Sequence, residues 1–134
     1  MNLVFDSNAL IAYLKTEPGA LVVKDLLEDQ ANECFIHSVN LCEVYYQTRR
    51  EYGESVAQQT MQVVHATGLN VQVDMDEDFW QEAGRIKADY KRVSLADCFC
   101  VALSNRVSGE VVTSDHHEIE PLVEAGVCKV RFFR

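Results

Sequence analysis

The sequence contains no long apolar run, no low-complexity tract, no internal repeat and no linker. A membrane-spanning helix needs roughly 20 predominantly apolar residues in succession, and no stretch approaches that length. The chain opens without a basic segment followed by an apolar one, so we expect no signal peptide. We therefore expect a single folded domain over residues 1–134, located in the cytoplasm and without membrane contact.

Basic residues are scarce. The chain has 12 Lys and Arg residues against 21 Asp and Glu residues, which gives a formal net charge of −9. Proteins that hold nucleic acid by bulk electrostatics gain their affinity from Lys and Arg at the phosphates, and this charge argues against such a mode. It does not exclude a protein that reaches phosphates through metal ions held by carboxylates. An acidic surface also suits a basic protein partner.

The chain also lacks the paired CxxC spacing of zinc sites and redox motifs. Its five cysteines are an odd number and have apolar neighbours: Cys34, Cys42, Cys98, Cys100 and Cys128. This pattern predicts reduced thiols in the core and argues against a disulfide framework or a zinc site.

What the chain does contain is a regular alternation of short apolar runs and amphipathic stretches. The apolar runs predict strands at 2–6, 34–39, 71–74, 111–115 and 127–133. Helical periodicity predicts helices at 9–15, 20–30, 40–52, 54–66, 76–90 and 95–104. We expect Ser7 or Asn8 to cap the first helix and Ser94 to cap the last. The alternation predicts an α/β fold, a three-layer α/β/α sandwich around a central, mostly parallel sheet.

Four acidic residues stand at the ends of these elements. Asp6 and Asp115 end strands, and Glu43 and Asp97 open helices with apolar neighbours. Each has a structural alternative, because both helix-opening acids have capping-box spacing and both strand-end acids suit turns. Together they indicate a ligand site, because ligands of open α/β sheets bind beyond the carboxyl ends of the strands. Carboxylates buried together need compensating cations, and their oxygens suit Mg²⁺ or Mn²⁺.

Four short motifs occur in order along the chain: Val4–Asn8, Ser38–Glu43, Ser94–Asp97 and Val112–Asp115. With these motifs the chain resembles the PIN domain family over essentially its whole length. A free-standing domain of this length most resembles the VapC-type toxins of bacterial and archaeal toxin–antitoxin pairs. One departure is that cysteines follow Asp97 where small apolar residues are more usual.

The resemblance implies a compact α/β/α fold and an endoribonuclease that depends on Mg²⁺ or Mn²⁺. It implies that the metal-binding and catalytic residues are Asp6, Glu43, Asp97 and Asp115, with Asn8 and Thr113 as supporting polar residues that orient carboxylates or water. In this reaction a metal-activated water attacks the RNA phosphodiester in line and leaves a 5′-phosphate and a 3′-hydroxyl. The implied partners are RNA, a cognate antitoxin protein and a second copy of the chain in a homodimer.

Other residues allow two interpretations. The basic residues between positions 85 and 92 either contact RNA phosphates or form a solvated face: Arg85, Lys87, Lys91 and Arg92. His116 and His117 either take part in metal or acid–base chemistry or begin a polar helix. Leu95 falls at core-facing spacing in its helix. Trp80 and the tyrosines also fall at core-facing spacing, so we expect no aromatic surface for stacking bases.

Three other functions compete with the nuclease. A phosphate-accepting receiver domain fits the length and the charge, and Asp74 adds a third strand-end acid, but Asp6 lacks the acidic neighbour that a receiver requires. A phosphatase with Asp6 as nucleophile lacks a second aspartate at position 8, where Asn8 stands. A docking module with the same fold but without catalysis has no support while all four acids are present.

Overall fold

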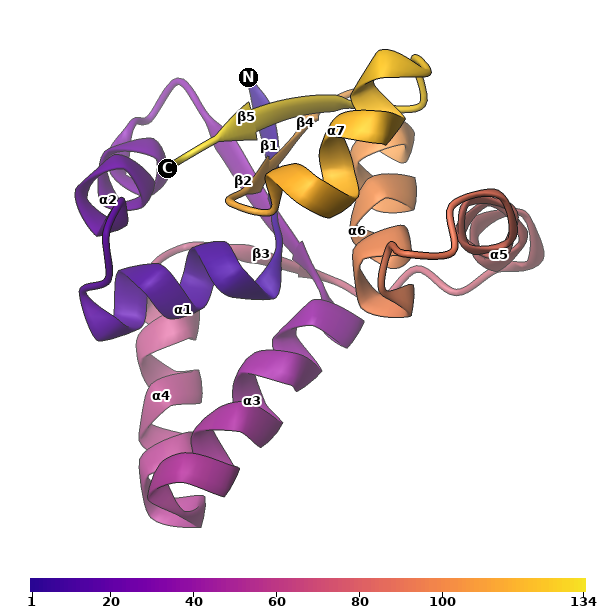
Figure 1. Cartoon of the computed structure of the whole chain (residues 1–134). Helices are drawn as coiled ribbons and strands as arrows, with labels where there is room; N and C mark the ends of the chain where they lie inside the picture. The colour runs from indigo at the N-terminus through magenta and orange to yellow at the C-terminus, as the bar shows by residue number, and fades with distance from the viewer.

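The structure is a computed structural model that describes residues 1–134 and is built on one five-stranded sheet (Figure 1). The strands are β1 (Asn2–Phe5), β2 (Glu33–His37), β3 (Asn70–Gln72), β4 (Glu110–Thr113) and β5 (Lys129–Phe132). They lie in the order β3-β2-β1-β4-β5, and every neighbouring pair is parallel. The predicted strands are therefore confirmed, with ends that differ by a residue or two.

Helices cover both faces of the sheet (Figure 1). They are α1 (Ser7–Lys15), α2 (Ala20–Glu28), α3 (Ser38–Tyr52), α4 (Glu54–Ala66), α5 (Glu77–Asp89), α6 (Leu95–Arg106) and α7 (His116–Glu124). One apolar core joins the sheet to α5, α6 and α7, and a second joins it to α1, α2, α3 and α4. This arrangement confirms the α/β/α sandwich. None of the helices has both the length and the apolar character needed to cross a membrane.

Strand β1 contributes to both cores. It pairs with β2 on one side and β4 on the other, and its side chains alternate between the two faces of the sheet. Val4 packs in the core with α6, whereas Leu3 and Phe5 pack in the core with α1 and α3. All three are fully buried, as expected for a central parallel strand. The chain therefore leaves the middle of the sheet after Phe5, and Asp6 is the first residue beyond it.

Helix α1 begins earlier than the sequence predicted. The carboxylate of Asp6 accepts a hydrogen bond from the Ala9 N–H at 2.8 Å and so acts as the N-cap. The predicted caps, Ser7 and Asn8, lie inside the helix. The physical reason is that a strand-end aspartate with extended backbone can itself bond the first free N–H groups of the helix.

Helix α3 also begins earlier than predicted, at Ser38 rather than at position 40. His37 is the N-cap, and its Nδ1 accepts a hydrogen bond from the Val39 N–H at 3.1 Å. An imidazole nitrogen is an uncommon capping acceptor, which explains why the sequence pattern did not reveal it. Asn40 consequently lies inside the helix, and its side chain is free for another contact.

Several side chains that were expected in the core lie at the surface, among them Leu95, Trp80, Tyr46 and Tyr52. Leu95 is 54% exposed and Trp80 is 46% exposed. Leu95 is the first residue of α6, ahead of Cys98, where the helix has entered the core. Trp80 follows the buried Phe79 on α5, and one residue turns a helical side chain by about 100°, away from the core.

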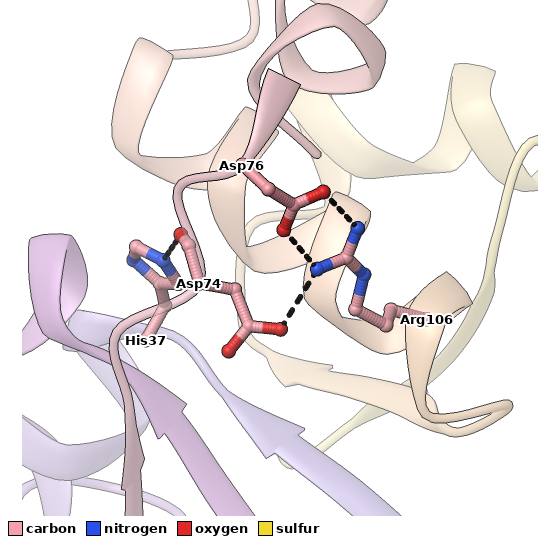
Figure 2. Close-up of polar contacts among 4 residues, drawn as sticks. All are labelled: His37, Asp74, Asp76 and Arg106. Atoms are coloured by element: carbon pink, nitrogen blue, oxygen red, sulfur yellow. Dashed lines mark hydrogen bonds and ion pairs between the residues drawn. The ribbon is translucent and has the colours of Figure 1, made fainter. Parts of the chain in front are cut away.

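Polar contacts tie the end of α6 to the segment between β3 and α5 (Figure 2). The Arg106 guanidinium bonds both carboxylate oxygens of Asp76 and, at 3.0 Å, Oδ2 of Asp74. It also lies 5.0 Å from the centre of the Phe79 ring. His37 Nε2 donates to the carbonyl oxygen of Asp74 at 2.8 Å, because its Nδ1 is already the acceptor in the α3 cap. These contacts fix the start of α5 against α6.

Replacing Arg106 with glutamine should destabilise the fold in a pH-dependent way. Hydrogen bonding to the Arg106 guanidinium lowers the pKa of Asp76 from 3.8 to about 2. Because the folded pKa lies below the unfolded one, this contribution to the free energy of unfolding is present above about pH 5 and is lost as pH falls towards about 2.

Urea denaturation across this acid range measures the effect. The difference in stability between the parent and Arg106→Gln should narrow as pH falls, and a difference of constant size would contradict the role given to this ion pair. Lys24→Gln is the control, because it removes a cation from an exposed pair whose atoms are 4.0 Å apart.

Candidate metal centre

Two acidic residues leave the sheet side by side. Phe5 lies opposite Val112 in the β1–β4 pair, so Asp6 and Asp115 follow at the same end of the sheet. Thr113, the last residue of β4, is fully buried. Its Oγ1 accepts a hydrogen bond from the Asp115 N–H at 3.0 Å, and its hydroxyl donates to the Asp6 carboxylate. Thr113 therefore connects the two acids.

Two further acids come from helices. Asp97 lies in the first turn of α6, and Glu43 lies in the second turn of α3. Glu43 Oε1 accepts a hydrogen bond from Ser7 Oγ at 3.0 Å, which joins α3 to the start of α1. After burial, repulsion from Glu43 is among the causes that raise the pKa of both Asp6 and Asp97. The structure thus brings the four acids from the sequence analysis to one end of the sheet.

A fifth acid, Glu118, joins them and was missed by the sequence analysis. Carboxylate oxygens of Asp97, Asp115 and Glu118 lie within 4.8 Å of one another. Glu118 lies in the first turn of α7, where its N–H donates to Asp115 Oδ1 at 3.0 Å. The sequence held a signal for it, because Asp115 and Glu118 have the same capping-box spacing as the helix-opening acids. We call these three residues, with Asp6 and Glu43, the acidic cluster.

Only one of the two hydrogen bonds of a capping box forms between Ser94 and Asp97. Ser94 Oγ accepts from the Asp97 N–H at 3.2 Å, which confirms Ser94 as the N-cap of α6. The reciprocal acceptor for the Ser94 N–H is Glu118 Oε2, at 3.5 Å, rather than Asp97. At α3 the box is absent, since Asn40 instead donates to the Ala96 carbonyl oxygen at 3.2 Å. The carboxylates of the cluster are therefore not explained by capping alone.

Burial makes the charged forms of Asp6 and Asp97 unfavourable. Asp97 is 8% exposed, and burial, followed by repulsion from Asp6 and Glu118, raises its pKa from 3.8 to about 8. Burial also raises the pKa of Asp6 to about 6, although hydrogen bonds from Thr113 and the Ala9 N–H oppose the shift. The cluster therefore retains protons near neutral pH unless a cation compensates its charge.

The donor set suits a hard divalent cation. Every member of the acidic cluster offers carboxylate oxygens, the ligands that Mg²⁺ and Mn²⁺ prefer. Cys100 is one turn from Asp97 but is fully buried, with its Sγ 4.0 Å from the Val4 carbonyl oxygen. Burial holds the pKa of this thiol well above its usual value, so it is not available as a thiolate ligand for softer metals.

The two supporting residues from the sequence analysis differ in their surroundings. Thr113 is buried and bonds two of the acids, as described above. Asn8 is exposed, and its neighbour Ser7, which is 6% exposed, forms the hydrogen bond to Glu43. The metal-binding and catalytic roles of Asp6, Glu43, Asp97 and Asp115 stay predictions.

Fold and site together define an α/β/α domain with a cluster of acids beyond the carboxyl ends of its central strands. The family model of the PIN domain matches residues 3–120. The chain belongs to the PIN domain family. No curated protein matches the sequence significantly.

Solved structures share this fold. A chain of a toxin–antitoxin complex from Klebsiella pneumoniae is 20% identical, with a TM-score of 0.73 and 98% of each chain covered. VapBC-1 from nontypeable Haemophilus influenzae is 14% identical, with a TM-score of 0.74 over 99% of this chain and 98% of that one. VapC20 from Mycobacterium tuberculosis, described as a toxin that cleaves the sarcin–ricin loop, is 14% identical, with a TM-score of 0.63 over 81% and 85%. At these identities the likeness concerns the fold.

Replacing Asp97 with asparagine should stabilise the metal-free protein at neutral pH. The pKa of Asp97 is about 8 when folded against 3.8 when unfolded, with burial as the main cause. The folded state therefore binds this proton more tightly, and the parent loses stability as pH rises from about 4 to about 8. Asparagine keeps the shape without the charge, so the variant should exceed the parent by on the order of a few kcal/mol at about pH 8.

Urea denaturation in the presence of EDTA, at acid and at mildly alkaline pH, measures this difference. The gain should shrink towards about pH 4, where the parent carboxyl group is protonated in the folded state. Asp89→Asn, at the exposed end of α5, is the matched control and should show no such trend. An Asp97→Asn variant less stable than the parent at alkaline pH would contradict a cluster under repulsion.

Proposed function

We propose that this PIN-domain protein is a VapC-type toxin, an endoribonuclease that uses Mg²⁺ or Mn²⁺ to hydrolyse RNA phosphodiester bonds. The observation that carries the proposal is the group of Asp97, Asp115 and Glu118, whose oxygens lie within 4.8 Å of one another. Carboxylates this close and partly buried repel one another, and a divalent cation relieves that repulsion. Membership of the PIN family supports the same reading.

The chain's own residues hold and orient the carboxylates. Thr113 and the Ala9 N–H bond the Asp6 carboxylate, and Ser7 bonds that of Glu43. Such partners fix ligand oxygens in direction and are part of a metal site. A bound Mg²⁺ or Mn²⁺ supplies positive charge to the scissile phosphate and lowers the pKa of the attacking water. No side-chain nucleophile is needed in this scheme.

Solved structures with the same fold support a proposal for the substrate and the partners of this chain. VapC20 is described as a toxin that cleaves the sarcin–ricin loop, and the structure from Klebsiella pneumoniae is a toxin–antitoxin complex. For this chain we propose an RNA substrate, a cognate antitoxin, a homodimer and a cytoplasmic location, with residues 1–134 as a single nuclease domain. The net charge of −9 suits an antitoxin segment with basic residues.

Phosphate-accepting chemistry at Asp6, in a receiver domain or a phosphatase, has less support. Asp6 is 2% exposed, and its carboxylate is engaged by the Ala9 N–H and by Thr113. Little of it is open to an incoming phosphoryl donor. A docking module without catalysis would carry several mutually repelling carboxylates with no use for them.

Purified protein should cleave single-stranded RNA in millimolar MgCl₂ or MnCl₂ and should be inactive in EDTA. Asp97→Asn should lower kcat/KM by orders of magnitude, because it removes a charge that holds the cation while preserving the shape of the side chain. Gel electrophoresis with analysis of the product ends measures this, with a 5′-phosphate expected. Asp89→Asn is the matched control, and a folded Asp97→Asn protein that cleaves at the parental rate would refute the assignment.

Mg²⁺ or Mn²⁺ should also raise the melting temperature of the parent. A cation at about 100 times its Kd stabilises a folded protein by about 2.7 kcal/mol when it does not bind the unfolded chain. Differential scanning fluorimetry near neutral pH, with NaCl at equal ionic strength as the control, measures the shift. Asp97→Asn should lose most of it, and a parent that does not respond to either metal contradicts a shared site.

A further inference from the structure

A small pocket adjoins the acidic cluster beside the connection between α5 and α6. It encloses about 230 Å³, and its walls include Tyr90, Lys91, Arg92, His117 and Glu118; we call it the basic pocket. Glu118 belongs to the pocket and also to the group of cluster oxygens within 4.8 Å of one another. An anion held in this pocket therefore lies next to the acidic cluster.

The cations of the basic pocket have no carboxylate partner. Six of the 12 Lys and Arg residues form ion pairs, and Lys91 and Arg92 are among the six that form none. Arg92 Nη1 lies 3.1 Å from His117 Nε2, which is the acceptor because a guanidinium only donates. The other N–H groups of Arg92 remain available. Lys91 and Arg92 are unpaired cations in the wall of a pocket, so their charge is open to an anionic ligand there.

Lys87 holds the connection that carries these cations. Its Nζ donates to the carbonyl oxygens of Lys91, at 2.9 Å, and Val93, at 2.7 Å. Its charge is thus used to fix the backbone, and Lys91 and Arg92 project from a restrained turn. The basic residues between positions 85 and 92 therefore separate into different roles, and Arg85 lies outside the pocket.

The size of the basic pocket limits what it binds. A volume of 230 Å³ is below the roughly 300–1,000 Å³ of pockets that enclose a small-molecule ligand. One unit of a polymer therefore fits better than a free ligand that needs an enclosing site of its own. A polymer unit recognised by Lys and Arg next to a group of acids that takes a divalent cation has the chemistry of a phosphodiester.

We propose that the basic pocket is a phosphate subsite for RNA, in which Arg92 and Lys91 bind the phosphate next to the one that is cleaved. This rests on the proposed ribonuclease function and adds the side on which the strand enters. Arg92 offers planar, paired donors to phosphate oxygens, and Lys91 adds a point charge. The subsite explains how a chain of net charge −9 holds an anionic strand at the acidic cluster.

Binding of a fluorescent single-stranded RNA oligonucleotide tests this proposal. The Asp97→Asn background in MgCl₂ keeps the RNA intact, and anisotropy is recorded at several NaCl concentrations with Arg92→Gln, Arg92→Lys and Arg85→Gln added in turn. Arg85→Gln is the matched control, because it removes the same charge from an exposed position outside the pocket.

Arg92→Gln should weaken binding by about tenfold at low salt and reduce the slope of log affinity against log salt by about 0.7, the value for one phosphate contact on a single strand. Arg92→Lys should retain most of the slope, and Arg85→Gln should leave both quantities unchanged. If the Arg92 guanidinium served only to hold the fold, lysine at this position would not restore the slope.

Equal affinity and slope in Arg92→Gln and Arg85→Gln would overturn the subsite. Loss in both Arg92 variants, together with a lower melting temperature, would also overturn it, since that result assigns Arg92 to the contact with His117. An acidic peptide of equal charge that binds as tightly as RNA and is equally weakened by Arg92→Gln would assign the pocket to a protein partner instead. A parent that cleaves no RNA, while Arg92→Gln still weakens RNA binding, would support the subsite and contradict the ribonuclease.

Discussion

Repulsion among carboxylates at one end of the sheet is the constraint on which the rest of the site depends. It arises from topology, because β1 and β4 are parallel neighbours and their carboxyl ends deliver Asp6 and Asp115 to the same place. α3 and α6 add Glu43 and Asp97, and α7 adds Glu118. Burial, with repulsion from neighbouring acids, raises the pKa of Asp6, Asp97 and Glu118, so the site is poised to take up protons or a cation.

Helix capping and metal binding are compatible explanations of these acids. Asp6 caps α1 and Asp115 caps α7, so each carboxylate meets the positive end of a helix. A capping carboxylate still has a further oxygen, and lone pairs on both, to offer a cation. At Asp97 the two roles are more clearly separated, because Glu118 rather than Asp97 accepts the hydrogen bond from the Ser94 N–H that would complete a capping box. The caps therefore hold the acidic cluster together in the folded protein.

Much of this could be predicted from the sequence, and the reasons for the failures are physical. Strand-end and helix-opening acids were visible because the β period gives way to the α period at Asp6 and because Ser94 and Asp97 have capping spacing at the start of α6. The contact of Arg106 with Asp74 and Asp76 was not, since it depends on side chains some thirty positions apart. Glu118 was missed although its spacing from Asp115 is that of a capping box, because a polar helix beginning at His116 was only one of two interpretations of that stretch. The His37 cap required an acceptor nitrogen that residue type alone does not reveal.

The distribution of charge over the chain bears on how an acidic protein holds RNA. An acidic protein repels RNA at long range, and salt in the cell screens this repulsion within about 8 Å. What matters at the site is therefore local charge: acids meet at the sheet end, and Lys91 and Arg92 line the adjoining pocket. A cation at the acids and two side-chain cations next to them would offset most of the local negative charge along a short track for the strand. Excess negative charge elsewhere then disfavours loose binding of RNA away from this track and suits a basic protein partner.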